Sequence, residues 1–404
     1  MRFWRSITTS LVGLSLTAAV CASVIPRWPA PEEAAATPAL DEASADTADT
    51  AYSADSADSA AADRAFRPPG VSPLLPWPTP SRPYTKPTCT PIVRKSWRKM
   101  STTEKSRYIT AVQCLTTKKS ISGIAGAKNI FDDFQGTHSQ QTPTIHWVGH
   151  FILWHRYFLA AYERSLRTLC SYNGAQPYWD WEYDNACGGD MNNWSVFDAT
   201  TGFGGNGPYT TGPNPFNIPD RTGGGCVPNG PFRASKFSVN MGPGNSTGYN
   251  PHCLTRDFSR PLMKWGNQNN INWVWDTCDY GSFTRRIENI PDFTVPNIHG
   301  SGHFGVGGAL GTIGDAYNSP GDPLFYLHHA NLDRVFWQWQ WQNKNLPKSL
   351  TEVSGPIVPF DYNNQQAGNV TADFQINIGK LAGDLPLSKL LNTQDYLCYT
   401  YEKP

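Results

Sequence analysis

Residues 322–340 read DPLFYLHHANLDRVFWQWQ, an apolar stretch in which His328 and His329 stand side by side. Proline is favoured at the first position of a helix, so Pro323 predicts that a helix begins here and continues through the aromatic residues. Adjacent side chains on an α-helix point about 100° apart, so both histidines cannot easily face one target. At most one of them is therefore expected to reach a shared site.

The histidines of the chain are concentrated in two regions. Eight of the nine fall within residues 138–155 or 299–329, and His252 stands alone in a loop with no expected role. Imidazole is a common metal ligand, and neutral nitrogen ligands without carboxylate or thiolate favour copper or zinc. Aromatic-flanked histidines gathered in two groups therefore predict a metal centre.

The second region has the spacing of a helical ligand pair. His299 and His303 are four residues apart, so on a helix they share one face and can bind one ion together. A third ligand from the following helix, His328 or His329, would complete a site with an open coordination position.

The first region is less regular. A helix is expected over residues 151–170, with His155 in its middle. His146 lies nine residues earlier, half a turn out of phase, so it is expected at or before the helix start. His138 is expected in the preceding loop. His150 is four residues from His146, and spacing alone leaves it open as a ligand.

Longer stretches around these histidines resemble a known family. HWVGHFILWHRYFLAAYE, residues 146–163, resembles the first copper-binding signature of type-3 copper proteins, the family of tyrosinases, catechol oxidases and hemocyanins. IHGSGHFGVGG, followed by SPGDPLFYLHHANLDRVFWQWQ, is similar to the second signature. The resemblance covers residues 87–402 and is closest to short secreted fungal tyrosinases and catechol oxidases. It implies a mainly α-helical fold, in which an antiparallel four-helix bundle holds a binuclear copper site amid long disulfide-braced loops and few short strands.

The resemblance also implies the cofactors and their ligands. It gives two copper ions with three histidines each, and O₂ as co-substrate. The family's last motif, laid on Asp322 and Phe325, falls on His329 rather than His328. The implied copper ligands are His138, His146 and His155 for the first ion, and His299, His303 and His329 for the second.

Residues near these ligands acquire expected roles. Asp333 is expected to accept a hydrogen bond from a ligand imidazole, with an ion pair to Arg156 or Arg334 as the alternative. In the family, the ring matching Phe325 covers the second copper in the substrate pocket. Ala316 falls at the family's gate position, where a small side chain would leave the entrance open.

Two departures from the family pattern refine the expected activity. Monophenol hydroxylation in the family is associated with a water-holding glutamate and an asparagine just after the first histidine of the second site. Here that next residue is Gly300, and the candidate glutamate is Glu288, with Asp292 as the alternative. Many fungal members also link a cysteine to the middle ligand of the first site. Thr144 occupies that position, so no cross-link and a more mobile His146 are expected.

These features together predict a type-3 copper polyphenol oxidase. The expected reaction is oxidation of o-diphenols, or of o-aminophenols, to o-quinones with O₂, with weak or uncertain monophenol hydroxylation. The alternatives are a full tyrosinase with monophenolase activity and a non-catalytic type-3 copper protein that only binds oxygen. The partner is a small phenol. The balance of 33 basic and 33 acidic residues gives no indication of a nucleic acid or membrane partner, and the oligomeric state stays open.

The N-terminal region predicts export. Residues 1–22 combine two arginines, a short apolar run and small residues before a cleavage site, as in a secretory signal peptide. Residues 23–86 are rich in Ala, Asp and Ser, and this composition is typical of a disordered or pro-segment. The copper-binding domain is then expected over residues 87–404.

Cysteines and sequons agree with a secreted glycoprotein. Eight cysteines remain after Cys21 leaves with the signal peptide, which suits four disulfides of undetermined pairing. Three glycosylation sequons begin at Asn193, Asn245 and Asn369.

Local structure can be predicted for two further regions. Ser101 and Glu104 form a capping box that predicts a helix over residues 101–115. Residues 185–290 are rich in Gly, Pro and Asn and predict long irregular connections. Near the ends of the domain, Arg94 is expected to pin the termini by cation–π contact with Tyr399 and Tyr401.

Overall fold

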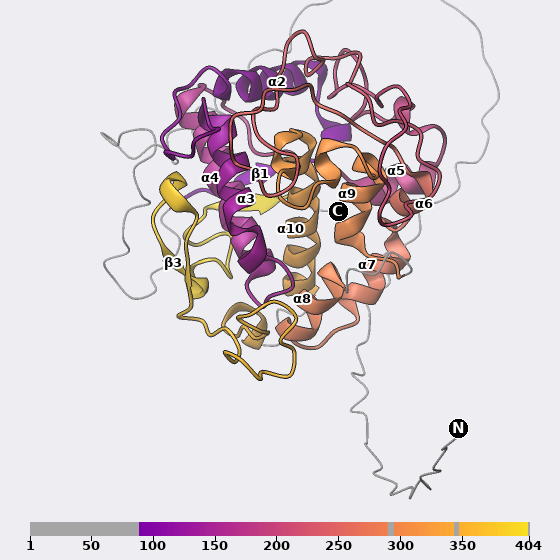
Figure 1. Ribbon diagram of the computed structural model, residues 1–404. Coiled ribbons are helices and arrows are strands. Elements are labelled where there is room, and N and C mark those ends of the chain that lie inside the picture. Colours follow the sequence, from indigo (N-terminus) through magenta and orange to yellow (C-terminus); the bar gives the residue numbers. More distant parts are fainter. Residues whose placement is uncertain (1–88, 290–294, 343–346, 403–404) are drawn as a thin grey trace, which may run out of the picture. The chain divides into compact units, whose positions relative to one another are not determined.

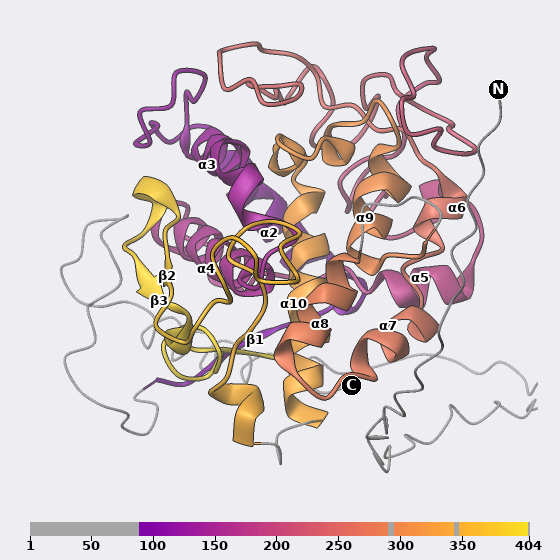
Figure 2. The same ribbon diagram turned by 60° about the horizontal axis from the view of Figure 1, so that its bottom comes forward.

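Four helices form the centre of the fold (Figures 1 and 2). They are α3 (Ile130–Ile145), α4 (Phe151–Leu169), α9 (Ile298–Gly307) and α10 (Leu324–Gln342). The computed structural model describes residues 89–289, 295–342 and 347–402. Within it, α10 packs against α4 and α9, and α3 packs against α4. The mainly α-helical fold with a four-helix core is therefore confirmed.

The expected loop around His138 is wrong, because these residues form α3. The side chain of Asn129 caps the helix by accepting a hydrogen bond from the Asp132 N–H, and Asp132 and Asp133 in the first turn suit the helix dipole. The sequence QGTHSQQTPT shows no apolar periodicity, because several of its polar residues are buried, and so the helix is not predicted from it. Pro143 stands in the last turn, where the helix ends.

Helices α4 and α10 are buried on nearly every face, which explains their apolar and aromatic sequences. Both helices are confirmed to within one residue: α4 ends at Leu169, one residue before the predicted end, and α10 begins directly after Pro323. The capping box of Ser101 and Glu104 also forms and begins α2 (Thr102–Leu115).

Glycines let α9 lie close to its neighbours. A Cβ at Gly302 would lie 2.3 Å from the His328 ring of α10. A Cβ at Gly305 would lie 2.6 Å from the backbone of Met263, in α6 (Arg260–Met263). Glycine disfavours a helix by about 1 kcal/mol relative to alanine, so α9 depends on these close contacts for its stability.

The region 185–290 is irregular only in its first part. Residues 194–259 contain no helix or strand, but α6, α7 (Gln268–Trp275) and α8 (Tyr280–Glu288) follow. The expectation of loops throughout is therefore wrong for the last part. Asn267 and Asp279 cap α7 and α8 by accepting hydrogen bonds from backbone N–H groups, a short-range signal that the surrounding polar residues obscure.

The remaining elements are short. The strands are β1 (Ile92–Arg94), β2 (Gln375–Ile376), β3 (Leu385–Pro386) and β4 (Tyr399–Tyr401). The other helices are α5 (Trp181–Cys187), η1 (Trp97–Lys99), η2 (Met191–Asn193), η3 (Thr312–Gly314), η4 (Ser319–Gly321), η5 (Pro347–Leu350), η6 (Gly379–Leu381) and η7 (Leu387–Lys389).

The two ends of the described domain are joined. β1 and β4 pair in parallel, and β2 and β3 pair antiparallel. The Arg94 guanidinium lies 3.6 Å from the ring centroid of Tyr399 and 5.8 Å from that of Tyr401. The expected cation–π contact is therefore confirmed.

Disulfides brace this domain, but not every cysteine pairs. Cys89 is bonded to Cys398, Cys114 to Cys170, and Cys226 to Cys253. Cys187 is an exposed free thiol, so the expectation that all eight cysteines pair is wrong at this position. It is the last residue of α5.

Several predictions concern residues outside the described ranges. They are the signal peptide, the low-complexity segment and the alternative acid Asp292. Among the residues that the structure describes, no helix combines the length and hydrophobicity needed to cross a membrane.

Candidate metal centre

The structure brings six histidines together in two groups of three. Within each group the ligand nitrogens lie within 4.8 Å of one another, and every member is buried. The groups are His138, His146 and His155, and His299, His303 and His329. These are the two sets implied by the family resemblance.

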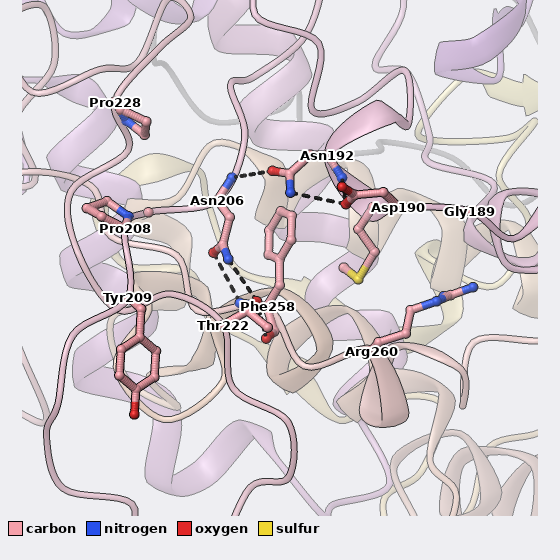
Figure 3. A pocket seen from close by; sticks show the side chains of 12 residues that line it. Gly189, Asp190, Asn192, Asn206, Pro208, Tyr209, Thr222, Pro228, Phe258 and Arg260 are labelled. Atoms are coloured by element: carbon pink, nitrogen blue, oxygen red, sulfur yellow. Dashed lines mark hydrogen bonds between the residues drawn. The ribbon is translucent and has the colours of Figure 1, made fainter.

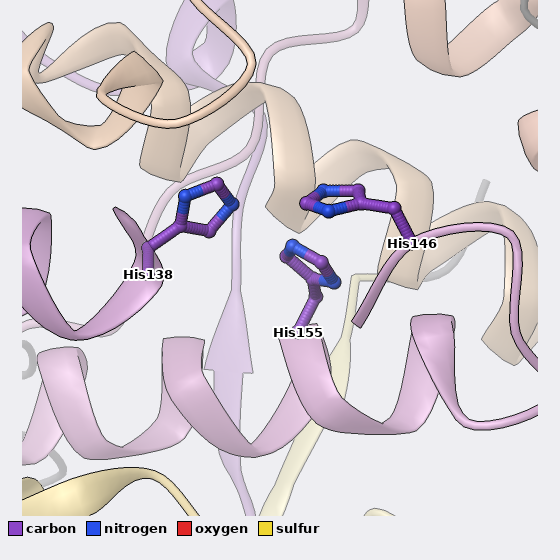
Figure 4. Close-up of side chains that lie close together, drawn as sticks. All are labelled: His138, His146 and His155. Atoms are coloured by element: carbon purple, nitrogen blue, oxygen red, sulfur yellow. The ribbon is translucent and has the colours of Figure 1, made fainter. Parts of the chain in front are cut away.

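Figure 4 shows how the first group forms. His138 projects from α3, His155 from the second turn of α4, and His146 from the turn between the two helices, and the three rings converge. His146 ends α3 in extended conformation, at φ −119° and ψ 148°, as expected for a residue before the start of α4.

Backbone carbonyls orient most of these rings. The Nδ1 atoms of His138, His146 and His155 lie 2.9, 3.1 and 2.9 Å from the carbonyl oxygens of Tyr317, Thr142 and Phe151, and Nδ1 of His303 lies 2.7 Å from that of Ile313. A carbonyl only accepts, so in each pair Nδ1 carries the proton and Nε2 keeps a free lone pair.

The free Nε2 atoms lack the partners that buried polar atoms need. Nε2 of His138, His155 and His299 is buried without a hydrogen-bond partner in the described structure. Nε2 of His303 and Nε2 of His329 face each other at 3.1 Å. Buried nitrogens without partners are costly unless a ligand satisfies them, so the residues present fit metal ions.

Burial also keeps the imidazoles neutral. Desolvation lowers the pKa of His146 and of His303 to about 4, and lowers the pKa of His155 well below its ordinary value. A neutral imidazole is the form that binds a metal, so these side chains need not lose a proton at neutral pH.

The two groups adjoin and open on one side. The rings of His155 and His329 stack with centroids 4.5 Å apart, which joins the groups at their buried end. His146, His299 and His303 are 7–9% exposed, against 1% for His155 and His329. Access from solvent is therefore on the side of His146, His299 and His303.

His328 and His150 lie outside both groups. The Nε2–H of His328 donates to the carbonyl oxygen of His299 at 2.9 Å, so this side chain holds α9 against α10. His150 Nε2 lies 2.9 Å from the carbonyl oxygen of Thr144, and its ring packs at a tilt against Phe374. Spacing alone left His150 open as a ligand, but the fold places it outside both histidine groups.

The carboxylate of Asp333 is occupied by groups other than a ligand histidine. It accepts hydrogen bonds from Arg156 at 2.5 Å, Arg94 at 3.3 Å and the hydroxyls of Tyr399 and Tyr401 at 2.5 and 2.6 Å. The expected bond from an imidazole does not form among the described residues, and the ion pair with Arg156 forms instead. Arg334, the other alternative partner, pairs with Glu182. Asp333 pairs with Arg156 and, together with Glu163, with Arg94, so its carboxylate belongs to a buried ion-pair network.

The expected pocket residues lie around the histidine groups at different depths. The Phe325 ring is fully buried, with its centroid 4.1 Å from that of His329 and 5.3 Å from that of His138, so it underlies both groups. Ala316 is exposed, and Gly300 is buried beside His299. A Cβ at Gly300 would lie 3.4 Å from the side chain of Asn297 and from the Phe304 ring.

Glu288 lies at the end of α8 beside the turn that carries His146. Both carboxylate oxygens accept a hydrogen bond from the Trp147 N–H at 2.8 Å. Burial raises the pKa of Glu288 well above its ordinary value, although hydrogen bonds from the Trp147 and Val148 N–H groups oppose this. Glu288 therefore anchors the turn in this structure.

Asn297 was missed by sequence reasoning. It caps α9 by accepting from the Gly300 N–H at 2.9 Å, and its amide donates to the Glu288 carbonyl oxygen. It thus joins the ends of α8 and α9 beside the second group. An asparagine just before the predicted helix was the available signal.

A surface pocket lies elsewhere (Figure 3). It is formed by loop residues 189–192 and 206–209 together with Thr222, Pro228, Phe258 and Arg260. No histidine lines it, and we assign it no part in the metal centre.

The described geometry matches known proteins. The family model for the common central domain of tyrosinase matches residues 128–342, a range that contains all six clustered histidines. The chain belongs to the tyrosinase family. This family assignment gives the two histidine groups their metals, two copper ions in a binuclear site that uses O₂.

Curated members of the tyrosinase family resemble the chain over most of its length. The tyrosinase-like protein phomQ1 of Diaporthe leptostromiformis is 32% identical over 78% of this chain and 78% of its own length. Tyrosinase ustQ of Aspergillus flavus is 34% identical over 78% of this chain and 81% of its own. Tyrosinase P of Aspergillus terreus is 30% identical over 77% of this chain and 92% of its own.

A solved structure has the same fold. A glycine-to-asparagine variant of the polyphenol oxidase from Thermothelomyces thermophila superposes with a TM-score of 0.69 at 30% identity, covering 78% of this chain and 89% of that one. The protein is thus an oxidoreductase of the tyrosinase and polyphenol oxidase type, and enzymes of this family act on small phenols.

Proposed function

We propose that this tyrosinase-family protein oxidises o-diphenols to o-quinones with O₂ and hydroxylates monophenols weakly. The observation that carries this proposal is the pair of adjoining buried histidine groups, whose remaining solvent exposure lies on one side, next to a glycine at position 300. When bound, the coppers supply oxidation by O₂. Two diphenols each lose two electrons and two protons, and one O₂ takes these up as two waters.

In this proposal each histidine group holds one copper. His138, His146 and His155 hold the first, and His299, His303 and His329 hold the second. The helices and the carbonyl contacts of Nδ1 orient the rings before any metal arrives, so little reorganisation is needed on binding.

The chain's other residues shape access and proton movement. Phe325 excludes water from beneath the two groups. Gly300 has no side chain and Ala316 has only a methyl group, so neither obstructs the less buried side of the site. Both carboxylate oxygens of Glu288 are engaged by the Trp147 N–H. A carboxylate held in this way is poorly placed to deprotonate a monophenol, which supports a preference for diphenols.

We also propose that the protein is secreted and glycosylated. The disulfides Cys89–Cys398, Cys114–Cys170 and Cys226–Cys253 indicate an oxidising compartment. The asparagines of the three sequons, Asn193, Asn245 and Asn369, are exposed, as acceptors must be.

A substrate panel tests the activity. Copper-loaded protein is offered catechol, L-DOPA, o-aminophenol and tyrosine, and O₂ uptake and quinone absorbance are followed. We expect rapid oxidation of the diphenols and slow oxidation of tyrosine. Substantial tyrosine turnover without a diphenol primer would contradict the diphenol preference, and reversible O₂ binding with no oxidation of any substrate would identify an oxygen-binding protein.

A further inference from the structure

His146 differs from the other five clustered histidines in its support. The others project from α3, α4, α9 and α10, whereas His146 lies in the turn of residues 146–150. Thr144, two residues before His146, gives its ring no support, because the Thr144 hydroxyl donates to the Gln141 carbonyl oxygen at 3.0 Å. Another contact must therefore hold the turn.

The residue after His146 has a costly backbone conformation. Trp147 has φ 53°, in the left-handed region that a bulky side chain rarely adopts. Such a conformation persists only where the surrounding structure enforces it. The contacts of Trp147 therefore identify what determines the shape of the turn.

Phe360 contacts Trp147 although it lies more than 200 residues away in sequence, and its backbone is also in the left-handed region. Phe360 has φ 63°, its N–H donates to the Trp147 carbonyl oxygen at 3.1 Å, and the two rings stack with centroids 4.7 Å apart and planes 21° apart. Phe360 is 47% exposed, so burial alone does not explain why it is held here. We name this stacked and hydrogen-bonded pair the 147–360 clasp.

The same turn is held at further points. The Trp147 N–H is bound by Glu288, as described above. The Gly149 N–H donates to the Pro356 carbonyl oxygen at 2.8 Å, and the Tyr280 hydroxyl donates to the Gly149 carbonyl oxygen at 2.7 Å. A Cβ at Gly149 would lie 2.7 Å from the Gly355 carbonyl oxygen, so residues 355–360 lie directly against the turn.

We propose that the 147–360 clasp positions His146 as a ligand of the first copper. Trp147 and Phe360 are positioning residues, because they act on the metal only through the backbone of His146. The proposal rests on the ligand assignment in the proposed function. It predicts that loss of the Phe360 ring weakens the first copper site and leaves the second unchanged.

Single-site variants of the full chain test this. His329→Ala leaves only the first group intact, and His155→Ala leaves only the second. Phe360→Ala is added to each, and the release of copper to a chelator is followed by metal analysis. We expect copper loss to become roughly 10-fold faster in the His329→Ala protein, because mutation of groups that support a metal ligand typically costs 10–100-fold in affinity. No change is expected in the His155→Ala protein.

Further variants separate the ring from the backbone. Phe360→Tyr keeps the ring and should restore slow copper loss, whereas Phe360→Gly keeps the N–H and relieves the backbone strain but should release copper as fast as Phe360→Ala. Phe374→Ala is the matched control, since the Phe374 ring contacts His150 at the other end of the same turn. It should leave the release rate unchanged.

The electron paramagnetic resonance spectrum of the single Cu(II) gives a second measurement. Loss of the clasp should alter the nitrogen coupling in the His329→Ala protein, a change that general destabilisation does not produce. The proposal is overturned if Phe360→Ala accelerates copper release equally in the His329→Ala and His155→Ala proteins, or does not accelerate it in the His329→Ala protein. If the two single-site proteins do not bind one copper each, the ligand assignment itself is wrong. Failure of the ligand assignment is therefore distinguishable from failure of the clasp.

Discussion

The two histidine groups are built in different ways. The second group comes from two packed helices, with His299 and His303 on one face of α9 and His329 on α10. The first group uses two helices and a strained turn, and distant residues 355–360 hold that turn. Equivalent ligand sets can thus rest on regular helix packing or on contacts between segments far apart in sequence.

Removal of one ligand has the largest expected effect and separates the groups directly. His329→Ala should lower the copper content from two ions to one and reduce catechol oxidation by at least roughly 10³-fold, because several kcal/mol of metal-supplied stabilisation are lost. Metal analysis and O₂ uptake measure both. Retention of two coppers would show that His329 is not a ligand.

Asp333→Ala should lower the stability of the helices that carry both histidine groups. Asp333 on α10 pairs with Arg156, the neighbour of His155 on α4, and its loss leaves Arg156 and Arg94 buried without this partner. Breaking a buried ion pair costs about 3–5 kcal/mol, so the free energy of unfolding in denaturant should fall by that amount.

The exposed pair of Lys348 and Glu352 provides the control for this variant. Glu352→Ala should change the free energy of unfolding by less than about 1 kcal/mol, because exposed ion pairs contribute little. An equally small effect of Asp333→Ala would contradict the assigned role of the buried network.

Gly302→Ala should affect the second group selectively. The added Cβ would lie 2.3 Å from the His328 ring and force α9 away from α10, and overpacking of this kind costs about 1–3 kcal/mol. Copper release from the second site should accelerate while release from the first stays constant. Gly248→Ala is the control, since the nearest atom to its Cβ is 3.7 Å away; equal acceleration at both sites would refute a selective role for Gly302.

His328→Leu should have the smallest effect. It removes the hydrogen bond to the His299 carbonyl oxygen, a loss of about 1 kcal/mol, but no copper ligand. The protein should keep two coppers and most of its catechol oxidation, measured as for His329→Ala. Loss of one copper would reverse the roles given to the adjacent histidines.

Much of the second group was readable from sequence. The spacing of His299 and His303 and the apolar run around His329 follow helical periodicity, and these helices form where expected. His138 was misplaced in a loop, because α3 buries polar residues against neighbouring elements and lacks an apolar periodicity. The ion pair of Asp333 with Arg156 was predicted as an alternative, but its hydrogen bonds from Tyr399 and Tyr401 were not predicted.

The sequence by itself determined the helices that carry most of the histidines, because local periodicity and capping are short-range properties. Its signatures also selected His329 over His328. Only the tertiary structure decided how His146 is held, why His150 is excluded and which side of the site is open. The position of His146 depends on Phe360, Glu288 and Pro356, which contact its turn from distant parts of the sequence. The place of His150 depends on its contact with Phe374, and no local pattern encodes such contacts.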